Sequence, residues 1–347
     1  MEHWLDDGLR RGEHGRLASE YPLSMGASGT RRHHVIYQQG RPAAHAMLHP
    51  VEIQTQGRRL RVGLVGNVYT DPAYRGRHFA SACVDACVAD ARRLRLPLVL
   101  LWSDAWDFYA RLGFHPVSRE RFLALEAERI VAAEPPRISP IEVGAPVERD
   151  WLALESLYAA KPQRVLRKAG ALRQLAAAPD CVLRVARVAG SPAGYAAVGR
   201  GDDFPGVIHE WAGGPGAVLA CLADLVRGSG AHTLLCGPSD EPAVERLIQA
   251  GAKPRDGAFA LARVLDAPAI WRTWVPNGSG VQLIHEKQHW RLQSLGQSVV
   301  LDAPETLDLL FGAGVRGRVR AKLPRLLRRR LDPLLPWPLY LWGFDSI

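Results

Sequence analysis

The sequence predicts an α/β (α+β) protein in which two related domains follow each other and a smaller segment closes the chain. The chain has 347 residues, which is long for one ordinary hydrophobic core. One order of apolar runs, turns and helical patterns occurs twice along it. A proline-rich stretch at 132–150 separates the two copies and is typical of a linker. We therefore expect domains at 1–131 and 151–264 and a C-terminal module at 265–347.

The first domain opens with mixed helical signals that continue to about Met25. Two apolar runs then flank a Gly-Arg-Pro turn in HHVIYQQGRPAAHAMLHPVEI, which predicts a β-hairpin. RLRVGLVGNVYT predicts a strand that ends at Asp71–Pro72, and the apolar spacing after YRGRHF predicts a helix. LPLVLLWS, at 96–103, has the length and composition of a buried strand. WDFYARLG predicts a short helix that ends at Gly113, and FHPV begins a further strand.

The second copy repeats this order. CVLRVARVAGSPAGYAAVGRG predicts a hairpin, with Gly190 standing where Gly40 stands in the first copy. GVIHEWAGGPGAVLACLADLV then gives a strand, a glycine-rich turn and a helix, and HTLLCGPSD gives another strand. AVERLIQAGAKPR is similar to FYARLGFHPV of the first copy. A divergent tandem duplication explains this correspondence.

The pattern changes beyond about residue 264. VQLIHEKQHWRLQSLGQSVVLDA indicates alternating strands, and Ala303–Pro304–Glu305 marks the start of a helix. The final stretch, DPLLPWPLYLWGFDSI, is apolar, aromatic and rich in proline. Because such a tail is costly to leave in water, we expect it to dock on the body of the protein.

The composition is that of a globular protein, since 47% of the residues are apolar and 23% are charged. No apolar run is long enough to span a membrane, and the N-terminus lacks the apolar core of a signal peptide, so we expect a cytoplasmic protein. The five cysteines are scattered without a metal-binding spacing. We expect reduced thiols, with Cys83 and Cys87 in the core, and no structural metal.

The net charge of +9 comes mainly from one segment. Between residues 316 and 330 the chain carries eight basic residues and no acid: Arg316, Arg318, Arg320, Lys322, Arg325, Arg328, Arg329 and Arg330. Apolar residues are interleaved, which predicts an amphipathic helix interrupted near Pro324. A solvated helix face is the simplest interpretation, and RNA, anionic lipid or an acidic protein is the alternative. The segment lacks the stacking aromatics of single-strand binders, so we do not expect nucleic-acid binding.

A candidate phosphate-binding turn lies in the first domain, where Arg75-Gly76-Arg77-His78 joins a strand to a helix. The start of a helix exposes backbone N–H groups and the positive end of the helix dipole, so a tight turn there can hold a pyrophosphate. Arg75 and Arg77 would add cationic donors.

Two motifs give this turn a family resemblance. VYTDPAYRGRHFASACV resembles the cofactor-binding motif of the GNAT N-acetyltransferases, which has Arg or Gln, two residues, Gly, one residue, and then Gly or Ala. FYARLGF is similar to the next motif of that family, and the two lie in the right order within residues 62–117. The resemblance implies a mixed, centrally splayed sheet flanked by helices in both domains, with acetyl-CoA as co-substrate of the first.

One position departs from the pattern. Arg75 and Ala80 match it, but His78 stands where the family has glycine. A side chain there would crowd the pyrophosphate if the backbone needs positive φ, whereas an outward imidazole would add a phosphate donor. We expect cofactor binding to be retained.

The resemblance also implies the roles of residues. The strand end would offer backbone groups to the acetyl carbonyl and the pantetheine arm, and the turn would bind the pyrophosphate. These implied cofactor-binding residues are Val68, Tyr69, Thr70, Arg75, Gly76, Arg77, His78, Phe79, Ala80 and Ser81. Tyr109 would be the general acid that protonates the leaving thiolate, because a phenol has a higher ordinary pKa than a thiol. Without the flanking motif, Tyr109 would be a core aromatic.

The general base is open between several groups. Asp104 and Asp107 lie close to Tyr109 in sequence, although Asp104 has the position of a helix cap. Glu210, in the HEW sequence of the second domain, could line an amine pocket, or it could pair with an arginine while Trp211 belongs to the core. Here GGPGAV replaces the arginine-bearing turn, so we expect no CoA binding in the second domain.

The tandem arrangement resembles the aminoglycoside-acetylating GNAT proteins of the enhanced-intracellular-survival type. In those proteins a sterol-carrier-like third domain follows, and the carboxylate at the end of the chain acts as base. This implies Ile347 as a further candidate base. Only about 80 residues follow Arg263, so the third module differs from that family or is shorter.

The leading hypothesis is an N-acetyltransferase that moves an acetyl group from acetyl-CoA to a small-molecule or peptide amine. The alternative is a non-catalytic acyl-CoA-binding sensor or regulatory module, which His78 and the degenerate second domain favour and Tyr109 disfavours. The sequence is compatible with an oligomer and does not identify the acceptor.

Overall fold

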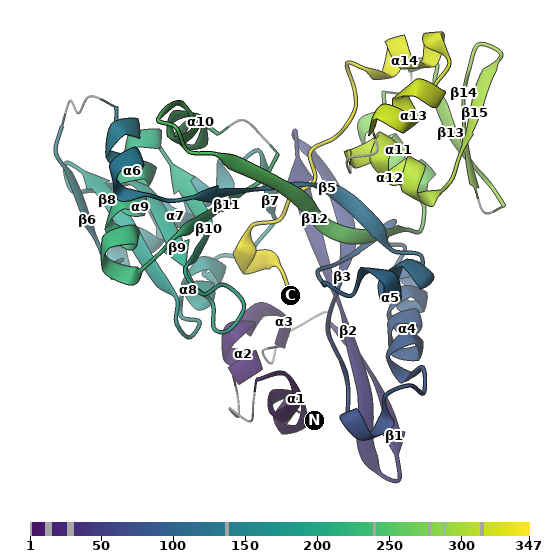
Figure 1. Ribbon diagram of the computed structural model, residues 1–347, viewed down its shortest axis with the longest axis horizontal. Helices are drawn as coiled ribbons and strands as arrows, with labels where there is room; N and C mark the ends of the chain where they lie inside the picture. Colours follow the sequence, from purple (N-terminus) through teal and green to yellow (C-terminus); the bar gives the residue numbers. More distant parts are fainter. Residues whose placement is uncertain are drawn as a thin grey trace.

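The computed structural model describes residues 2–10, 16–25, 31–135, 139–238, 241–276, 279–287, 289–312 and 316–347. It has two lobes joined by a pair of long strands, and a smaller group of helices and strands stands beside the first lobe (Figure 1). The last residues of the chain lie between the two lobes (Figure 1). None of the described helices is long and apolar enough to cross a lipid bilayer.

The first lobe begins with three short helices and continues into long antiparallel strands. The predicted hairpin is confirmed, with Gln39 and Gly40 at positive φ in its turn. Gly113 has φ 77° after the short helix, as its predicted role at the helix end requires. The elements are α1 (Glu2–Leu9), α2 (Arg16–Glu20), α3 (Pro22–Met25), β1 (Arg32–Gln38), β2 (Arg41–Thr55), β3 (Arg58–Thr70), α4 (Phe79–Arg93), β4 (Leu98–Leu101), α5 (Trp106–Arg111) and β5 (His115–Ala124).

The second lobe contains the same succession of hairpin, strand, helix, strand, helix and strand. Its opening hairpin again turns through two residues at positive φ, Ala189 and Gly190. The elements are α6 (Ala127–Ala133), β6 (Ile141–Gly144), α7 (Trp151–Ala159), β7 (Gln163–Val165), α8 (Ala171–Ala176), β8 (Val182–Val188), β9 (Ser191–Val198), β10 (Val207–Gly213), α9 (Pro215–Ser229), β11 (Thr233–Cys236), α10 (Pro242–Gln249) and β12 (Pro254–Val264).

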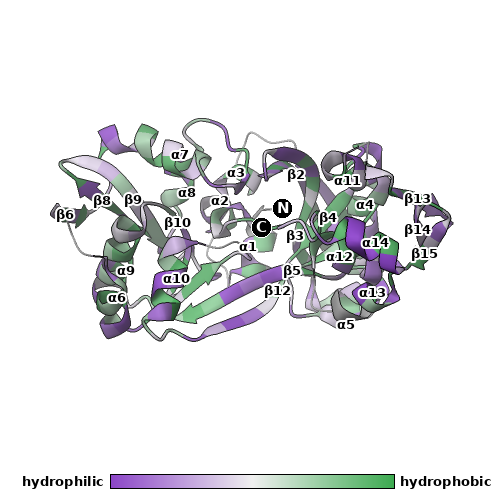
Figure 2. Cartoon of the chain, turned by 90° about the horizontal axis from the view of Figure 1, so that it is seen from above, coloured by the Kyte–Doolittle hydropathy of each residue, from purple (hydrophilic) through white to green (hydrophobic). Residues whose placement is uncertain are grey.

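The two lobes share one sheet because each gives its last strand to the other. Within the described residues this sheet has twelve strands, in the order β1-β2-β3-β4-β12-β5-β11-β10-β9-β8-β6, with β7 paired to β2. Strand β12 of the second lobe pairs with β4 of the first, and β5 of the first pairs with β11 of the second. Seen from above, β5 and β12 run side by side from lobe to lobe (Figure 2). The sequence predicts the strands and gives no signal for this exchange.

The C-terminal module packs its helices against a separate three-stranded sheet. The predicted strands and the helix start at Ala303 are confirmed. Asp302 caps that helix in a capping box with Glu305. The elements are α11 (Ala267–Trp274), β13 (Gln282–Glu286), β14 (His289–Ser294), β15 (Gln297–Leu301), α12 (Ala303–Phe311), α13 (Arg316–Lys322) and α14 (Arg325–Leu331).

The basic segment forms two helices, α13 and α14, separated at Pro324 as predicted. Val319, Leu323 and Leu327 are buried against the module. Several of these side chains have partners within the protein: Arg320 with Asp332, Lys322 with Glu305, and Arg330 with Ser279 and Ser294. Part of the charge is therefore neutralised locally.

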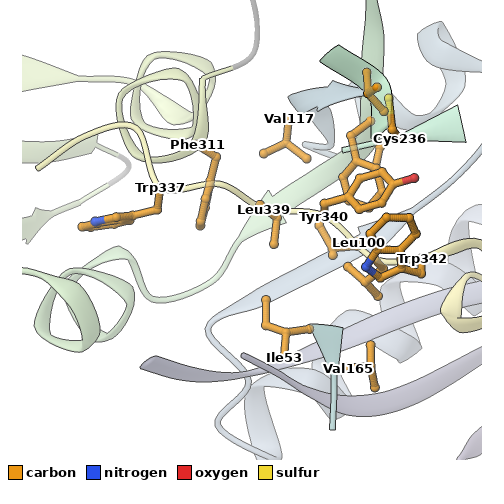
Figure 3. Packing of buried hydrophobic residues seen from close by; sticks show 14 of the residues in the cluster. Ile53, Leu100, Val117, Val165, Cys236, Phe311, Trp337, Leu339, Tyr340 and Trp342 are labelled. Carbon is orange, nitrogen blue, oxygen red and sulfur yellow. The ribbon is translucent and has the colours of Figure 1, made fainter. Parts of the chain in front are cut away.

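The C-terminal tail docks on the body, as the sequence predicts. Trp337, Tyr340 and Trp342 each have 2% of their surface exposed. Trp337 stacks on Trp274 at a ring distance of 4.8 Å, and the tail continues past Phe311 into the core between the lobes (Figure 3). Cys83 and Cys87 are buried in the cluster beneath α4, which confirms their predicted place in the core.

Candidate functional site

Two parallel strands of the first lobe diverge and leave a gap in the sheet. Strands β3 and β4 pair only at Gly63 with Val99 and at Leu64 with Leu100. Beyond this pair β4 soon ends, while β3 continues to Thr70 and stays bonded to β2. The divergence leaves the backbone of β3 without a strand partner on one side. A cavity of about 530 Å³ begins at this gap and extends to the second lobe.

A β-bulge shapes β3 beside the gap. The register with β2 shifts between His45 and Met47, and Asn67 takes φ 51°. The buried His45 ring contacts the Asn67 carbonyl oxygen through Nδ1 at 2.7 Å, and its Nε2 lies 2.9 Å from Nδ1 of His33. Burial lowers the pKa of His45 to about 4, so the ring is neutral and Nδ1–H donates to the carbonyl. His45 thus holds the bulge in place.

Predicted cofactor residues occupy the bulged strand and the turn that follows it. Val68 lines the cavity, Tyr69 packs its ring on Trp4 at 5.0 Å, and the Thr70 carbonyl accepts a hydrogen bond from Nε of Arg75 at 3.4 Å. The turn ends where α4 begins, so Phe79, Ala80 and Ser81 carry the first free N–H groups of that helix.

The histidine that replaces glycine sits in the left-handed backbone region. His78 has φ 59° and Gly76 has φ 79°, so the turn bends through two positive-φ residues. His78 is exposed, and its side chain makes no cap hydrogen bond to α4. Arg75 and Arg77 are also exposed, and Arg77 lies over the Tyr74 ring at 5.5 Å. Three side chains with donor groups therefore surround the start of the helix, which suits a polyanion.

Tyr109 lies in the wall of the cavity at the same gap. It comes from α5, where the Phe108 and Phe114 rings pack around it at 4.9 and 6.0 Å. Burial raises the pKa of its phenol to about 12, and the Ser103 side chain offsets part of this rise. The hydroxyl is protonated at neutral pH and can donate a proton into the cavity. The structure therefore brings Tyr109 together with Val68.

The predicted acids do not all reach this cavity. Asp104 lines it and is exposed at its edge, whereas Asp107 is exposed and lies outside the lining. The prediction that Asp104 caps α5 is wrong, because the N-cap is Ala105 and has no side-chain acceptor. Ser103 instead accepts a hydrogen bond from the Ala105 N–H.

Glu210 does not face the cavity. Its carboxylate accepts two hydrogen bonds from Arg167, at 2.8 and 2.5 Å, and one from Tyr195 at 3.0 Å. Trp211 is 2% exposed and belongs to the core. This is the structural alternative that the sequence left open, and the Glu210 carboxylate is fully engaged within the protein.

Glu120 of β5 lines the cavity, and sequence reasoning did not single it out. Within the described part of the chain no hydrogen bond or ion pair reaches its carboxylate. Burial raises the pKa of Glu120 to about 8. One acid in SRERF carries no spacing signal, so only the fold reveals it.

The equivalent gap in the second lobe is filled by the C-terminal tail. Strands β10 and β11 pair only at Val207 with Thr233 and at Ile208 with Leu234. Trp342 packs on Trp211 of β10 at a ring distance of 5.2 Å. On Gly237, just beyond β11, a side chain would collide with Tyr340 at 2.7 Å, and on Gly343 of the tail one would collide with His209 of β10 at 2.5 Å.

Two buried arginines of the second lobe hold the end of this tail. Arg167 donates to Asp345 at 2.7 Å, and Arg200 donates to the carbonyl oxygens of Gly343 and Ser346 at 2.7 and 3.0 Å. Burial lowers the pKa of Arg200 to about 9. The tail is thereby led to the first lobe, where the Ile347 main-chain carbonyl carbon lies 3.0 Å from where a Cβ on Gly66 would stand.

Ile347 separates the main cavity from a second one. The second cavity measures about 320 Å³ and lies between α3, β2 and α8. Its lining mixes apolar residues with polar ones, among them His49, Glu52 and Lys168, and Ser346 and Ile347 line both cavities. The end of the chain is therefore part of the wall of both cavities.

Comparison with known proteins shows what the chain is similar to. A profile of the acetyltransferase (GNAT) domain matches residues 18–117. A GCN5-related N-acetyltransferase from Kribbella flavida is 16% identical, with a TM-score of 0.64 over 91% of this chain and 87% of that one. A probable N-acyltransferase from Enterococcus faecalis V583 is 13% identical, with a TM-score of 0.70 over 99% and 95%. Eis1 from Mycobacterium abscessus is 15% identical, with a TM-score of 0.62 over 94% and 92%. No curated protein sequence matches the chain. At these identities the likeness establishes a shared fold.

Proposed function

We propose that this chain, which carries a GNAT acetyltransferase domain at residues 18–117, transfers an acetyl group from acetyl-CoA to an amine of a small molecule or peptide. The observation that carries the proposal is the gap between β3 and β4, where unpaired backbone and a protonated Tyr109 face one cavity. The fold supports acyl transfer from an acyl-CoA, and acetyl as the acyl group is our proposal.

The residues present fit the co-substrate. The start of α4, with Arg75, Gly76 and Arg77, offers N–H groups and two cations to the pyrophosphate. The pantetheine arm would follow the open side of β3, where backbone groups of Val68 and its neighbours replace a missing strand. The acetyl carbonyl would then lie near the Tyr109 hydroxyl.

In the proposed reaction the neutral amine attacks the thioester carbonyl carbon directly. A C–N bond forms, and the negative charge that develops on the carbonyl oxygen is stabilised by backbone N–H groups of β3. When the C–S bond breaks, Tyr109 donates its proton to the CoA sulfur. The surplus proton of the amine passes to a base.

The cavity favours a cationic acceptor. Of its acids, Asp203 is paired with Arg10 at 3.1 Å, whereas Asp104 and Glu120 have no ion pair within the described residues. Arg200 is occupied by the carbonyl oxygens of the tail. We propose the Ile347 carboxylate as the base, because this residue lies against β3 and lines the cavity, with Asp104 as the alternative.

Tyr109→Phe tests the proposal. We expect kcat for acetyl-CoA-dependent acetylation in a screen of amines to fall by roughly ten-fold to ten-thousand-fold, with nearly unchanged CoA affinity. Thiol release measures kcat, and calorimetry measures the affinity. Tyr37→Phe is the matched control, because Tyr37 is 56% exposed on β1 and lies outside the cavity. CoA binding without thiol release from any amine would instead support the acyl-CoA sensor.

A further inference from the structure

Glu120 lies in the wall of the proposed catalytic cavity and takes part in no step of the proposed acetyl transfer. Its neighbours on β5 do not neutralise it, because Arg119 is exposed and Arg121 pairs with Asp256 at 3.1 Å. Directly opposite on β12 stands Gly257, which has no side chain to cover the carboxylate. Glu120 therefore has room beside it, and none of the cationic side chains in the described part of the chain forms an ion pair with it.

The surroundings of Glu120 resemble a receptor for a cation. The same cavity is lined by Trp102, Leu235, Phe259 and Leu341. The Trp102 and Phe259 rings pack edge to face at 5.5 Å, and Tyr340 lies 5.1 Å from Phe259. Aromatic side chains attract ammonium groups, and a carboxylate supplies the opposite charge. Without a partner, Glu120 keeps its proton in these surroundings, and an ammonium group bound beside it would stabilise the ionised carboxylate.

The ladder of the sheet gives the separation between Glu120 and the gap. Val68 at the gap lies on β3 and Glu120 lies on β5, and the sheet order β3-β4-β12-β5 places these strands three positions apart. At about 4.8 Å for each position, this corresponds to roughly 14 Å across the sheet. Glu120 is thus too far across the cavity to take the proton of an amine that attacks beside Val68.

We propose that Glu120, with Trp102 and Phe259, binds a second cationic group of the acceptor, so that the preferred acceptors are diamines or polyamines that span the cavity. This inference rests on the proposed function, since it places the reacting amine at the gap near Tyr109. The second ammonium anchors the acceptor at its far end, and the first is then held near the acetyl group.

The test compares acceptors that differ only in the second charge. A series from diaminobutane to diaminododecane is assayed by thiol release beside the monoamines of equal carbon number. The wild-type chain should show the highest kcat/KM with a long diamine. Glu120→Gln should lower kcat/KM for that diamine by roughly ten- to hundred-fold, and it should leave the monoamine within about two-fold.

Controls separate this inference from the proposed function. Glu128→Gln removes an exposed acid of α6 outside the cavity and should change neither rate. Equal effects of Glu120→Gln on diamine and monoamine would reject the subsite and leave acetyl transfer standing. Thiol release from no amine, together with calorimetric binding of the long diamine to wild type and not to Glu120→Gln, would reject acetyl transfer and keep the subsite. Equal binding to both chains would reject the subsite as well.

Discussion

At the scale of the residue, His78 and Glu120 show what a sequence motif can predict and what it misses. The motif identifies the turn at His78, and the structure shows the positive φ that explains the glycine of related proteins. An exposed histidine tolerates this conformation at a cost of about 1 kcal/mol, and its side chain need not enter the phosphate site. Glu120 belongs to no motif, because its importance comes from strands that are distant in sequence. Local patterns therefore predict Tyr109 and the turn, and they miss the far wall of the cavity.

Glu120 also predicts a pH dependence of stability. The pKa of Glu120 is about 8 in the folded chain, whereas its ordinary value, which applies to the unfolded chain, is 4.5. Between these two pH values the unfolded chain has lost the proton that the folded chain keeps. The stability that this group contributes is fully present below about pH 4.5 and is lost as pH rises through about 8. Glu120→Gln lacks this loss and should gain stability relative to wild type between pH 5 and pH 8. Urea unfolding at pH 5 and at pH 8 measures the difference in unfolding free energy between Glu120→Gln and wild type. The same difference at both pH values would contradict the raised pKa of Glu120. Tyr340 and Cys236 are the titratable groups whose pKa values the charge of Glu120 raises.

At the scale of the element, the hairpins, the strand before the turn and the short helix with Tyr109 were predictable. Their signals are local: alternation, a glycine at positive φ, or apolar residues at helical spacing. The gap between β3 and β4 was expected only through family resemblance. Its closeness to Ile347 depends on contacts between residues far apart in the chain, which no local pattern encodes.

Gly66→Ala tests whether β3 and the end of the chain must touch. A Cβ on Gly66 would lie 2.9 Å from Cγ1 of Ile347 and 3.0 Å from its carbonyl carbon, so Ile347 must move. If the Ile347 carboxylate is the base, kcat should fall at least about ten-fold while CoA affinity stays the same. Gly144→Ala is the control, because the nearest atom to its Cβ is Nη1 of Arg187 at 3.7 Å. Full activity of Gly66→Ala would contradict the Ile347 carboxylate as the base and would favour Asp104, the alternative.

At the scale of the whole molecule, the exchange of β5 and β12 makes the two lobes one cooperative structure. The predicted duplication describes how the elements follow one another, whereas the sheet order shows that each lobe lacks its last strand without the other. The tail adds to this coupling, because Trp342 of the chain end lies in the gap of the second lobe. Unfolding one lobe therefore exposes the core of the other.

Trp342→Ala should show this coupling. Removing an indole that is 2% exposed should cost about 3–5 kcal/mol of unfolding free energy. The loss should move the thermal transition of both lobes together, as followed by hydrogen exchange of amides in β2 and β9. Two transitions, of which only that of the second lobe shifts, would contradict a single cooperative unit.

Because the C-terminal tail fills the gap of the second lobe, any molecule from solution would have to compete with the tail for that gap. Its occupant, the segment around Tyr340 and Trp342, is covalently attached and is therefore present at an effective concentration on the order of millimolar. A molecule from solution would have to displace this tail segment, which stays close to the gap even when it is released. Of the two gaps, one is thus open to a molecule that arrives from solution, and the other is occupied by a segment of the chain itself.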